Sequence, residues 1–174
     1  DGIVLETGWT EFDKVYDGKN IPDEYRVTVP TEPQKMTVLI VPPMQEPYIK
    51  EISTGLEALQ KEVGGRIEVV YPFAEPVGLI CNDEGKNERM ELNRALYDAE
   101  DNMYDIIAGT FVLAGLSGDN FGSLDKDQIK QFSERFAKPE MFMRINGKIT
   151  AVEVKPSIKA KLDRLQKEQN NTDK

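Results

Sequence analysis

The stretch YDIIAGTFVLAGL, residues 104–116, is the longest part of the chain that carries almost no charge. β-Branched and aromatic side chains stand there among small ones, and both alternating sets of residues are apolar. A strand with two apolar faces is typical of the interior of a sheet that is covered on both sides. The pattern therefore predicts a central strand around which the other elements are arranged.

Four further segments predict strands from their β-branched and aromatic residues. The first ends at Pro42 and Pro43, because proline cannot donate a hydrogen bond to a neighbouring strand. We expect the second to return antiparallel to the first, and residues 83–85, DEG, to form a hairpin tip after the fourth. The predicted strands are MTVLIV (36–41), YIKEI (48–52), RIEVVY (66–71) and VGLIC (77–81).

Two helices are predicted at residues 54–63 and 125–137, where a capping pair precedes apolar residues at helical spacing. The capping pairs are Thr54 with Glu57 and Asp125 with Gln128. The spacing of Leu92, Ala95 and Leu96 predicts a short helix or a helical turn within ERMELNRALY, residues 88–97.

These elements predict a single α+β domain of two layers, in which a mostly antiparallel sheet centred on residues 106–114 carries two packed helices. Residues 1–33 are an N-terminal extension with a candidate hairpin, and residues 34–140 form the core domain. In the C-terminal part, residues 141–174, the dipeptide Asn146-Gly147 predicts a second hairpin. Ser157 is placed to cap a basic amphipathic helix after it.

Composition excludes several classes of function. The chain has no histidine and a single cysteine, Cys81, so histidine-based catalysis, an intramolecular disulfide and a cysteine-built zinc site within one chain are excluded. We therefore expect no metal and no cofactor, and the lack of a catalytic motif argues against an enzyme but leaves that class open. The net charge of -9 is spread among interspersed lysines and arginines, which favours neither nucleic acid nor anionic membrane as a partner. No apolar run approaches the ~18 residues that cross a bilayer, and the expected location is the cytoplasm.

Asn93, Arg94 and Asp105 are the candidate binding residues, because they form the only polar set among apolar segments. A buried arginine needs a compensating charge, so a structural ion pair between Arg94 and Asp105 is the simpler interpretation. The functional alternative is a cleft in which Arg94 binds a carboxylate or phosphate through two hydrogen bonds.

Two other features suggest chemistry but have simpler explanations. Cys81 is interpreted as a small buried hydrophobe, because Asp83 and Glu84 oppose formation of a thiolate. The stretch GLSGDNFG, residues 115–122, precedes a helix as a phosphate-binding loop does. It lacks the Gly-Lys-Ser/Thr ending and carries Asp119, so we interpret it as an ordinary turn between a strand and a helix.

Several blocks occur in the order of a known family: LIVPPMQEPYIKEISTGLEALQKEVGGRIEVVYPF, VGLICNDEGK, LNRAL and YDIIAGTFVLAGL. Over residues 35–136 the chain resembles a family of domains of unknown function from conjugative elements, plasmids and phages of Gram-positive anaerobes. The resemblance implies an accessory protein of a mobile genetic element and no particular activity.

With no catalytic set in the sequence, we expect a protein-interaction module with a protein partner. Three alternatives stay open. The first is a small-molecule-binding or enzymatic domain with its site near Asn93 and Arg94. The others are an acidic DNA mimic of the anti-restriction type and a domain that binds nucleic acid through the terminal helix.

Overall fold

The computed structural model describes residues 34–155 together with residues 158, 161, 163 and 164, all within one compact unit of the chain. The predicted N-terminal hairpin and most of the predicted terminal helix lie outside the described residues. No helix in the described part is long and apolar enough to cross a membrane.

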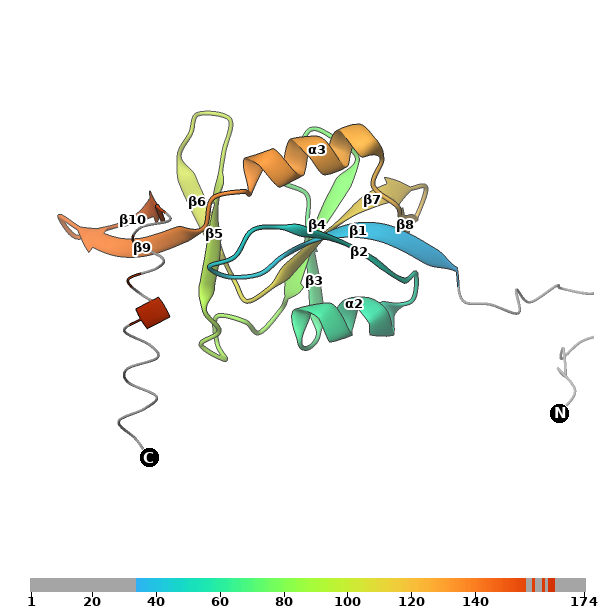
Figure 1. The fold of residues 1–174 in the computed structure, drawn as a ribbon, viewed down its shortest axis with the longest axis horizontal. Helices are drawn as coiled ribbons and strands as arrows, with labels where there is room; N and C mark the ends of the chain where they lie inside the picture. Colours follow the sequence, from blue (N-terminus) through green and yellow to red (C-terminus); the bar gives the residue numbers. More distant parts are fainter. Residues whose placement is uncertain (1–33, 156–157, 159–160, 162, 165–174) are drawn as a thin grey trace, which may run out of the picture. The chain divides into compact units, whose positions relative to one another are not determined.

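The main sheet has six strands and is antiparallel at every pairing (Figure 1). Its order is β2-β1-β7-β4-β3, and β8 pairs with β7 outside this path. As predicted, β2 returns antiparallel to β1. The strands are β1 (Lys35–Val41), β2 (Tyr48–Ser53), β3 (Ile67–Val70), β4 (Val77–Asn82), β7 (Phe111–Ser117) and β8 (Asn120–Gly122).

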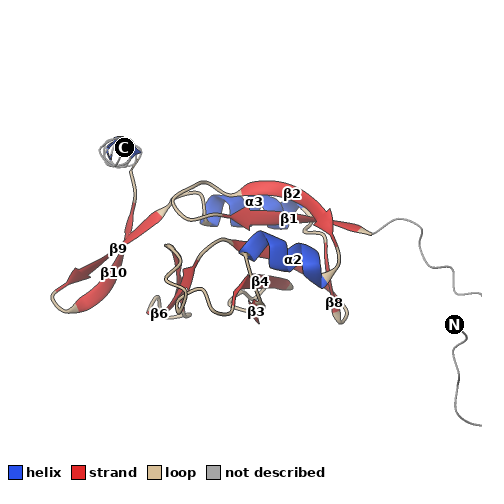
Figure 2. Ribbon diagram, turned by 90° about the horizontal axis from the view of Figure 1, so that it is seen from below, coloured by secondary structure: helices blue, strands red, loops and turns tan. Residues whose placement is uncertain are grey.

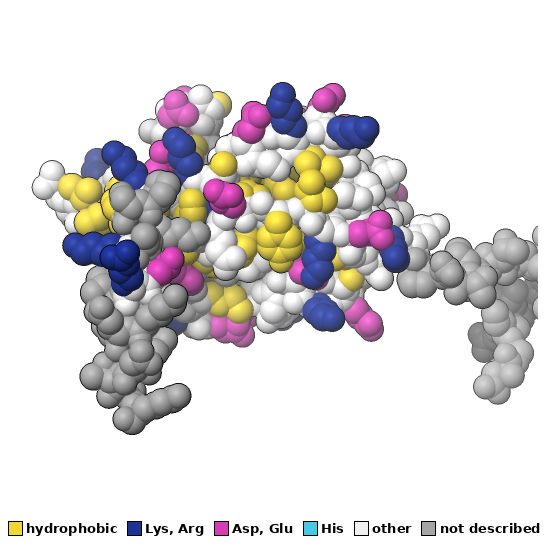
Figure 3. All heavy atoms as spheres, in the orientation of Figure 1, with side chains coloured by type: hydrophobic (Ala, Val, Ile, Leu, Met, Phe, Trp, Pro, Cys, Tyr) yellow, Lys and Arg dark blue, Asp and Glu magenta, His cyan; other side chains and the backbone are white. Residues whose placement is uncertain are grey.

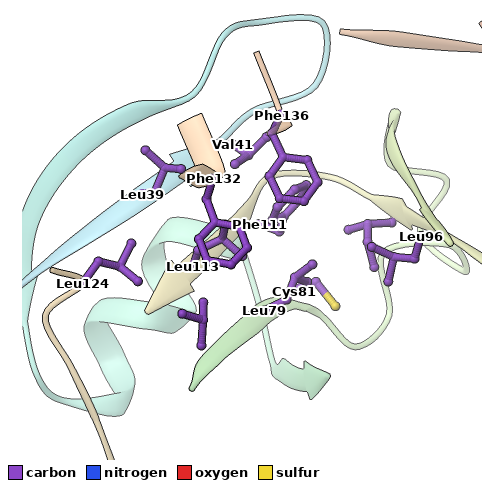
Figure 4. Packing of buried hydrophobic residues seen from close by; sticks show 12 residues of the cluster. Leu39, Val41, Leu79, Cys81, Leu96, Phe111, Leu113, Leu124, Phe132 and Phe136 are labelled. Carbon is purple, nitrogen blue, oxygen red and sulfur yellow. The ribbon is translucent and has the colours of Figure 1, made fainter. Parts of the chain in front are cut away.

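Both faces of the main sheet are covered, by a different helix on each side. Phe111 and Leu113 of β7 pack in the cluster that contains Phe132 of helix α3 (Lys126–Arg135), whereas Val112 packs on the opposite side with Leu59 of helix α2 (Leu56–Val63). Figure 1 shows α3 above the sheet and α2 below it, and Figure 4 shows Phe132 beside Phe111 and Leu113. The predicted α+β domain is confirmed, but its layers are three rather than two, because the helices occupy opposite faces.

The stretch that predicted one central strand forms two. Gly109 has a φ of 77°, in the left-handed region that favours glycine, and it separates β6 (Met103–Ala108) from β7. β7 is the central strand of the main sheet, whereas β6 pairs with β5 (Leu92–Tyr97) in a separate two-stranded sheet. The predicted centre at residues 106–114 is therefore corrected to β7.

The prediction of a helix over residues 88–97 is wrong, because Leu92–Tyr97 is the strand β5. The apolar spacing within this short segment fits either structure, and pairing with β6 determines the outcome. The predicted hairpin tip at residues 83–85 is also corrected. It begins a longer turn region that leads from β4 to β5, two strands that belong to different sheets.

The helix ends follow the predictions in part. Asp125 accepts a hydrogen bond from the Gln128 backbone (2.8 Å), and the Gln128 side chain accepts one from the Asp125 backbone (3.0 Å), so this capping box is confirmed. The capping box predicted at Thr54 is wrong. Gly55 is the N-cap of α2, and the Thr54 amide donates instead to the Gln34 carbonyl (2.9 Å).

The predicted Asn146-Gly147 hairpin is confirmed. β9 (Glu140–Ile145) and β10 (Lys148–Glu153) are joined by these two residues, whose φ values of 51° and 80° fit the tight turn that follows strand twist. Figures 1 and 2 both show this hairpin extending away from the main sheet beside the β5–β6 sheet. The C-terminal hairpin therefore adds a third sheet to the domain.

Candidate functional site

Arg94 is buried and tied to three parts of the fold. Only 1% of its surface is exposed. Its Nη2 donates to the carbonyl oxygens of Gln45 (2.9 Å) and Phe136 (2.8 Å), and its Nη1 donates to Oδ1 of Asn93 (2.8 Å). Phe136 is the C-cap of α3, so the guanidinium lies at the negative end of a helix dipole. The side chain joins β5, the β1–β2 loop and the end of α3.

Asn93 is also fully buried and has its own backbone partners. Its Nδ2 donates to the carbonyl oxygens of Val41 and Gly109, both at 2.8 Å. One of these groups ends β1 and the other lies in the turn between β6 and β7. Asn93 and Arg94 thus bond to each other and to protein carbonyls, which is the arrangement of a structural anchor.

The predicted Arg94–Asp105 ion pair does not form. Asp105 lies opposite Leu96 in the β5–β6 ladder and pairs with Lys86. The carbonyl groups take the role that a carboxylate was expected to have. Burial lowers the pKa of Arg94 from its ordinary value, and the negative charge of Glu140 acts in the opposite direction.

Glu140, which the sequence did not single out, fastens the hairpin to the core. It is the first residue of β9, and its Oε2 accepts a hydrogen bond from the Ala95 backbone amide of β5 (2.7 Å). Burial raises the pKa of Glu140 above its ordinary value, while the Ala95 amide and the charge of Arg94 oppose this rise. The hairpin base is therefore attached beside the Arg94 anchor.

A polar cavity of about 190 Å³ lies between the end of β4 and the strand β6. Cys81 and Asn82 contribute to it from β4, and Lys86 and Asp105 contribute their ion pair. Burial raises the pKa of Cys81 to about 11, and the negative charges of Glu68 and Asp105 add to the rise. The interpretation of Cys81 as a buried residue is confirmed, and at neutral pH it is a thiol rather than a nucleophilic thiolate.

An apolar groove of about 350 Å³ lies on the other side of the Lys86–Asp105 pair. It runs between the β5–β6 sheet and the hairpin, and both sides supply exposed apolar side chains. Tyr104 is 55% exposed and Ile149 is 48% exposed. The residues that line the groove are Lys86, Leu92, Met103, Tyr104, Asp105, Ile106 and Ile149.

The three predicted site residues are not brought together. Asp105 lies at the boundary between the polar cavity and the apolar groove, while Asn93 and Arg94 line neither. The sequence missed Tyr104 and Ile149, which come from segments more than forty residues apart. Among the residues that the structure describes, no group of three or more acidic, cysteine or histidine side chains is placed to hold a metal ion.

The glycine-rich stretch at residues 115–122 forms the β7–β8 hairpin, which turns at Gly118 (φ 59°). Gly115 faces Gly122 across this hairpin, and a Cβ atom on Gly115 would lie 2.5 Å from the Ser123 carbonyl oxygen. The glycine at this position permits a close backbone approach. The strand β8 separates the turn from α3, so the turn does not present an anion to the helix N-terminus.

The fold and the site define an α+β domain whose central sheet is covered on both faces and whose exposed groove adjoins a separate hairpin. Residues 36–137 match the model of the family described as domain of unknown function DUF3846, and the chain belongs to this family. No curated protein and no solved structure matched the chain. The matched region ends before β9, so the groove lies between the family domain and a hairpin outside the matched residues.

Proposed function

We propose that this chain is a protein-binding module whose binding surface is the apolar groove and the adjoining β9–β10 hairpin. The observation that carries the proposal is where the exposed apolar side chains lie. Of the twelve large apolar residues that are exposed in the described part of the chain, seven belong to the two small sheets. These are Leu92, Tyr97, Tyr104, Met143, Ile145, Ile149 and Val152.

Exposed apolar side chains that lie close together, as Leu92, Tyr104 and Ile149 do in the groove, mark surfaces that bind other proteins. The two small sheets contain Tyr and Met, residue types that are enriched in protein interfaces. Figure 3 shows hydrophobic side chains next to basic ones over the hairpin, at the left of the view. The concave groove between Tyr104 and Ile149 suits an apolar side chain of a partner, and the Lys86–Asp105 pair forms a polar rim on one side.

The setting is also part of the proposal. The sequence blocks resemble domains from conjugative elements, plasmids and phages, which supports an accessory role in a mobile genetic element. Such a module would act by binding a host or plasmid protein in the cytoplasm. Lysines interspersed with the acidic residues argue against the alternative of a DNA mimic, which needs carboxylates spaced as regularly as phosphates.

The test is a comparison of matched variants in affinity capture from nuclease-treated lysate of a Gram-positive host. Tyr104→Glu places a charge in the groove, and Tyr71→Glu places the same change at an exposed tyrosine just after β3. We expect a protein that binds the wild type and Tyr71→Glu but is lost with Tyr104→Glu. The proposal is contradicted if all three capture the same proteins, or if the wild type captures none.

A further inference from the structure

The outer edge of β10 is the edge of the hairpin that faces away from β9. β10 pairs with β9 and, within the part of the chain that the structure describes, with no other strand. An unpaired strand edge presents backbone N–H and C=O groups to which another strand can be added. A two-stranded hairpin is only marginally stable in water, so an added strand also completes an otherwise thin sheet.

The two faces of the hairpin are both apolar along its middle. Because opposed residues share a face, Met143 lies with Val152 and Ile145 on one face, and Ile149 lies with Phe142 on the other. Ile149 lines the apolar groove, while Met143 and Ile145 are 50% and 45% exposed. A strand added at β10 would therefore contact apolar residues with both of its alternating sets of side chains.

The turn and the base of the hairpin differ in charge. Arg144 and Lys148 flank the turn, are exposed, and form no ion pair with any carboxylate of the described residues. At the base, Glu140 is held by Ala95 and Glu153 is paired with Lys138 (2.9 Å). The turn is therefore a small basic end on a chain whose net charge is -9.

We infer that the partner contributes an extended segment that pairs with β10 as an added strand, with its carboxylates at the Arg144–Lys148 end and apolar residues along the middle. This inference rests on the proposed function and specifies its partner. Backbone hydrogen bonds supply affinity in this mode, and the groove and the basic turn supply specificity. The apolar groove and the strand edge favour a peptide segment over nucleic acid or a lipid surface.

The experiment is a selection from a displayed library of random peptides about ten residues long, enough for one strand, on the full chain. Arg144→Glu/Lys148→Glu is the counter-selection variant, and Lys126→Glu/Lys130→Glu reverses two exposed charges on α3 as the matched control. Enriched peptides should combine alternating apolar residues with Asp or Glu at one end. Each should lose about 10-fold in affinity on the hairpin variant and keep its affinity on the control.

Two additional measurements sharpen the test. N-methylation of alternate backbone amides in a selected peptide should abolish binding, and replacing its acidic residues with Lys should restore binding to the hairpin variant. The inference is overturned if the N-methylated peptide still binds, or if the affinity is the same for the wild type and the hairpin charge variant. Failure to enrich any peptide over the counter-selection, or a hairpin-dependent preference for phosphatidylserine vesicles or duplex DNA, also overturns it.

The outcomes separate this inference from the proposed function. Peptides that are lost with Tyr104→Glu but bind equally well to the hairpin charge variant would support the groove and refute the added strand. Peptides that bind equally to both variants would refute both.

Discussion

The main sheet and the C-terminal hairpin use the same kinds of residue in opposite ways. The apolar residues 38–41 of β1 and 111–113 of β7 are at most 1% exposed, because a helix covers each face of their sheet. On β9 and β10, Met143, Ile145 and Ile149 are about half exposed. Apolar alternation predicts a strand in both places, and the presence of a covering layer decides whether that strand stabilises the fold or is available for binding.

The largest expected effect comes from truncating one apolar side chain in the main sheet and comparing it with a truncation to alanine in the hairpin. Phe111→Ala removes a fully buried ring that packs on Phe136 at a centroid distance of 5.3 Å, so we expect a loss of about 3–5 kcal/mol in the free energy of unfolding. Ile149→Ala on the hairpin should cost no more than about 0.5 kcal/mol. Urea denaturation measures both. Equal losses would show that the hairpin is packed as tightly as the core.

The second-largest loss in the free energy of unfolding is expected at Arg94, which lies between these two regions. Arg94→Met removes a guanidinium and leaves the carbonyl oxygens of Gln45 and Phe136 without their donors, at a cost of about 3 kcal/mol. Arg66→Met removes exposed ion pairs to Asp83 and Glu84 and should cost at most about 1 kcal/mol. Chemical denaturation of the two variants under the same conditions tests the difference, and a cost near zero for Arg94→Met would contradict the anchor role.

The smallest effect concerns pH at the hairpin base. Because burial raises the pKa of Glu140, the folded chain keeps a proton that the unfolded chain releases just above the ordinary glutamate pKa. The stabilisation from this group is complete below that pKa and is lost as pH rises through the raised value. Glu140→Gln can still accept the Ala95 hydrogen bond, and it should reduce the fall in stability across this window.

The measurement is the free energy of unfolding of the wild type and Glu140→Gln as a function of pH. Glu134→Gln, at an exposed position on α3, is the control and should keep the wild-type slope. A Glu140→Gln profile parallel to that of the wild type would show that Glu140 is not buried at the hairpin base.

Local signals predicted those parts of the fold that depend on a few neighbouring residues. The Asp125–Gln128 capping box and the Asn146-Gly147 turn are examples, because their geometry follows from the residues themselves. The break at Gly109 was missed, since an apolar run shows no sign of a positive φ at one glycine. β5 was mistaken for a helix because its identity depends on β6, which lies later in the chain.

The candidate site was harder to predict than the fold, because it depends even more on contacts between residues that are distant in the sequence. The sequence identified Asn93 and Arg94 as an unusual polar pair, and both are buried. Their partners are mostly backbone carbonyls, which every residue has and which no sequence pattern marks. Tyr104 of β6 and Ile149 of β10 line the same groove only because the folded chain brings the hairpin next to the β5–β6 sheet. One signal was present in the sequence, because both arms of the hairpin carry apolar residues in both of their alternating sets.

The Arg94 anchor also sets the order in which this chain can complete its structure. Its carbonyl partners lie 49 residues before it, at Gln45, and 42 residues after it, at Phe136. Closing contacts of such long sequence separation is slow and comes late in folding. During synthesis the guanidinium therefore stays without its α3 partner until Phe136 has left the ribosome, so the domain reaches its native core only when nearly all of the family region has emerged.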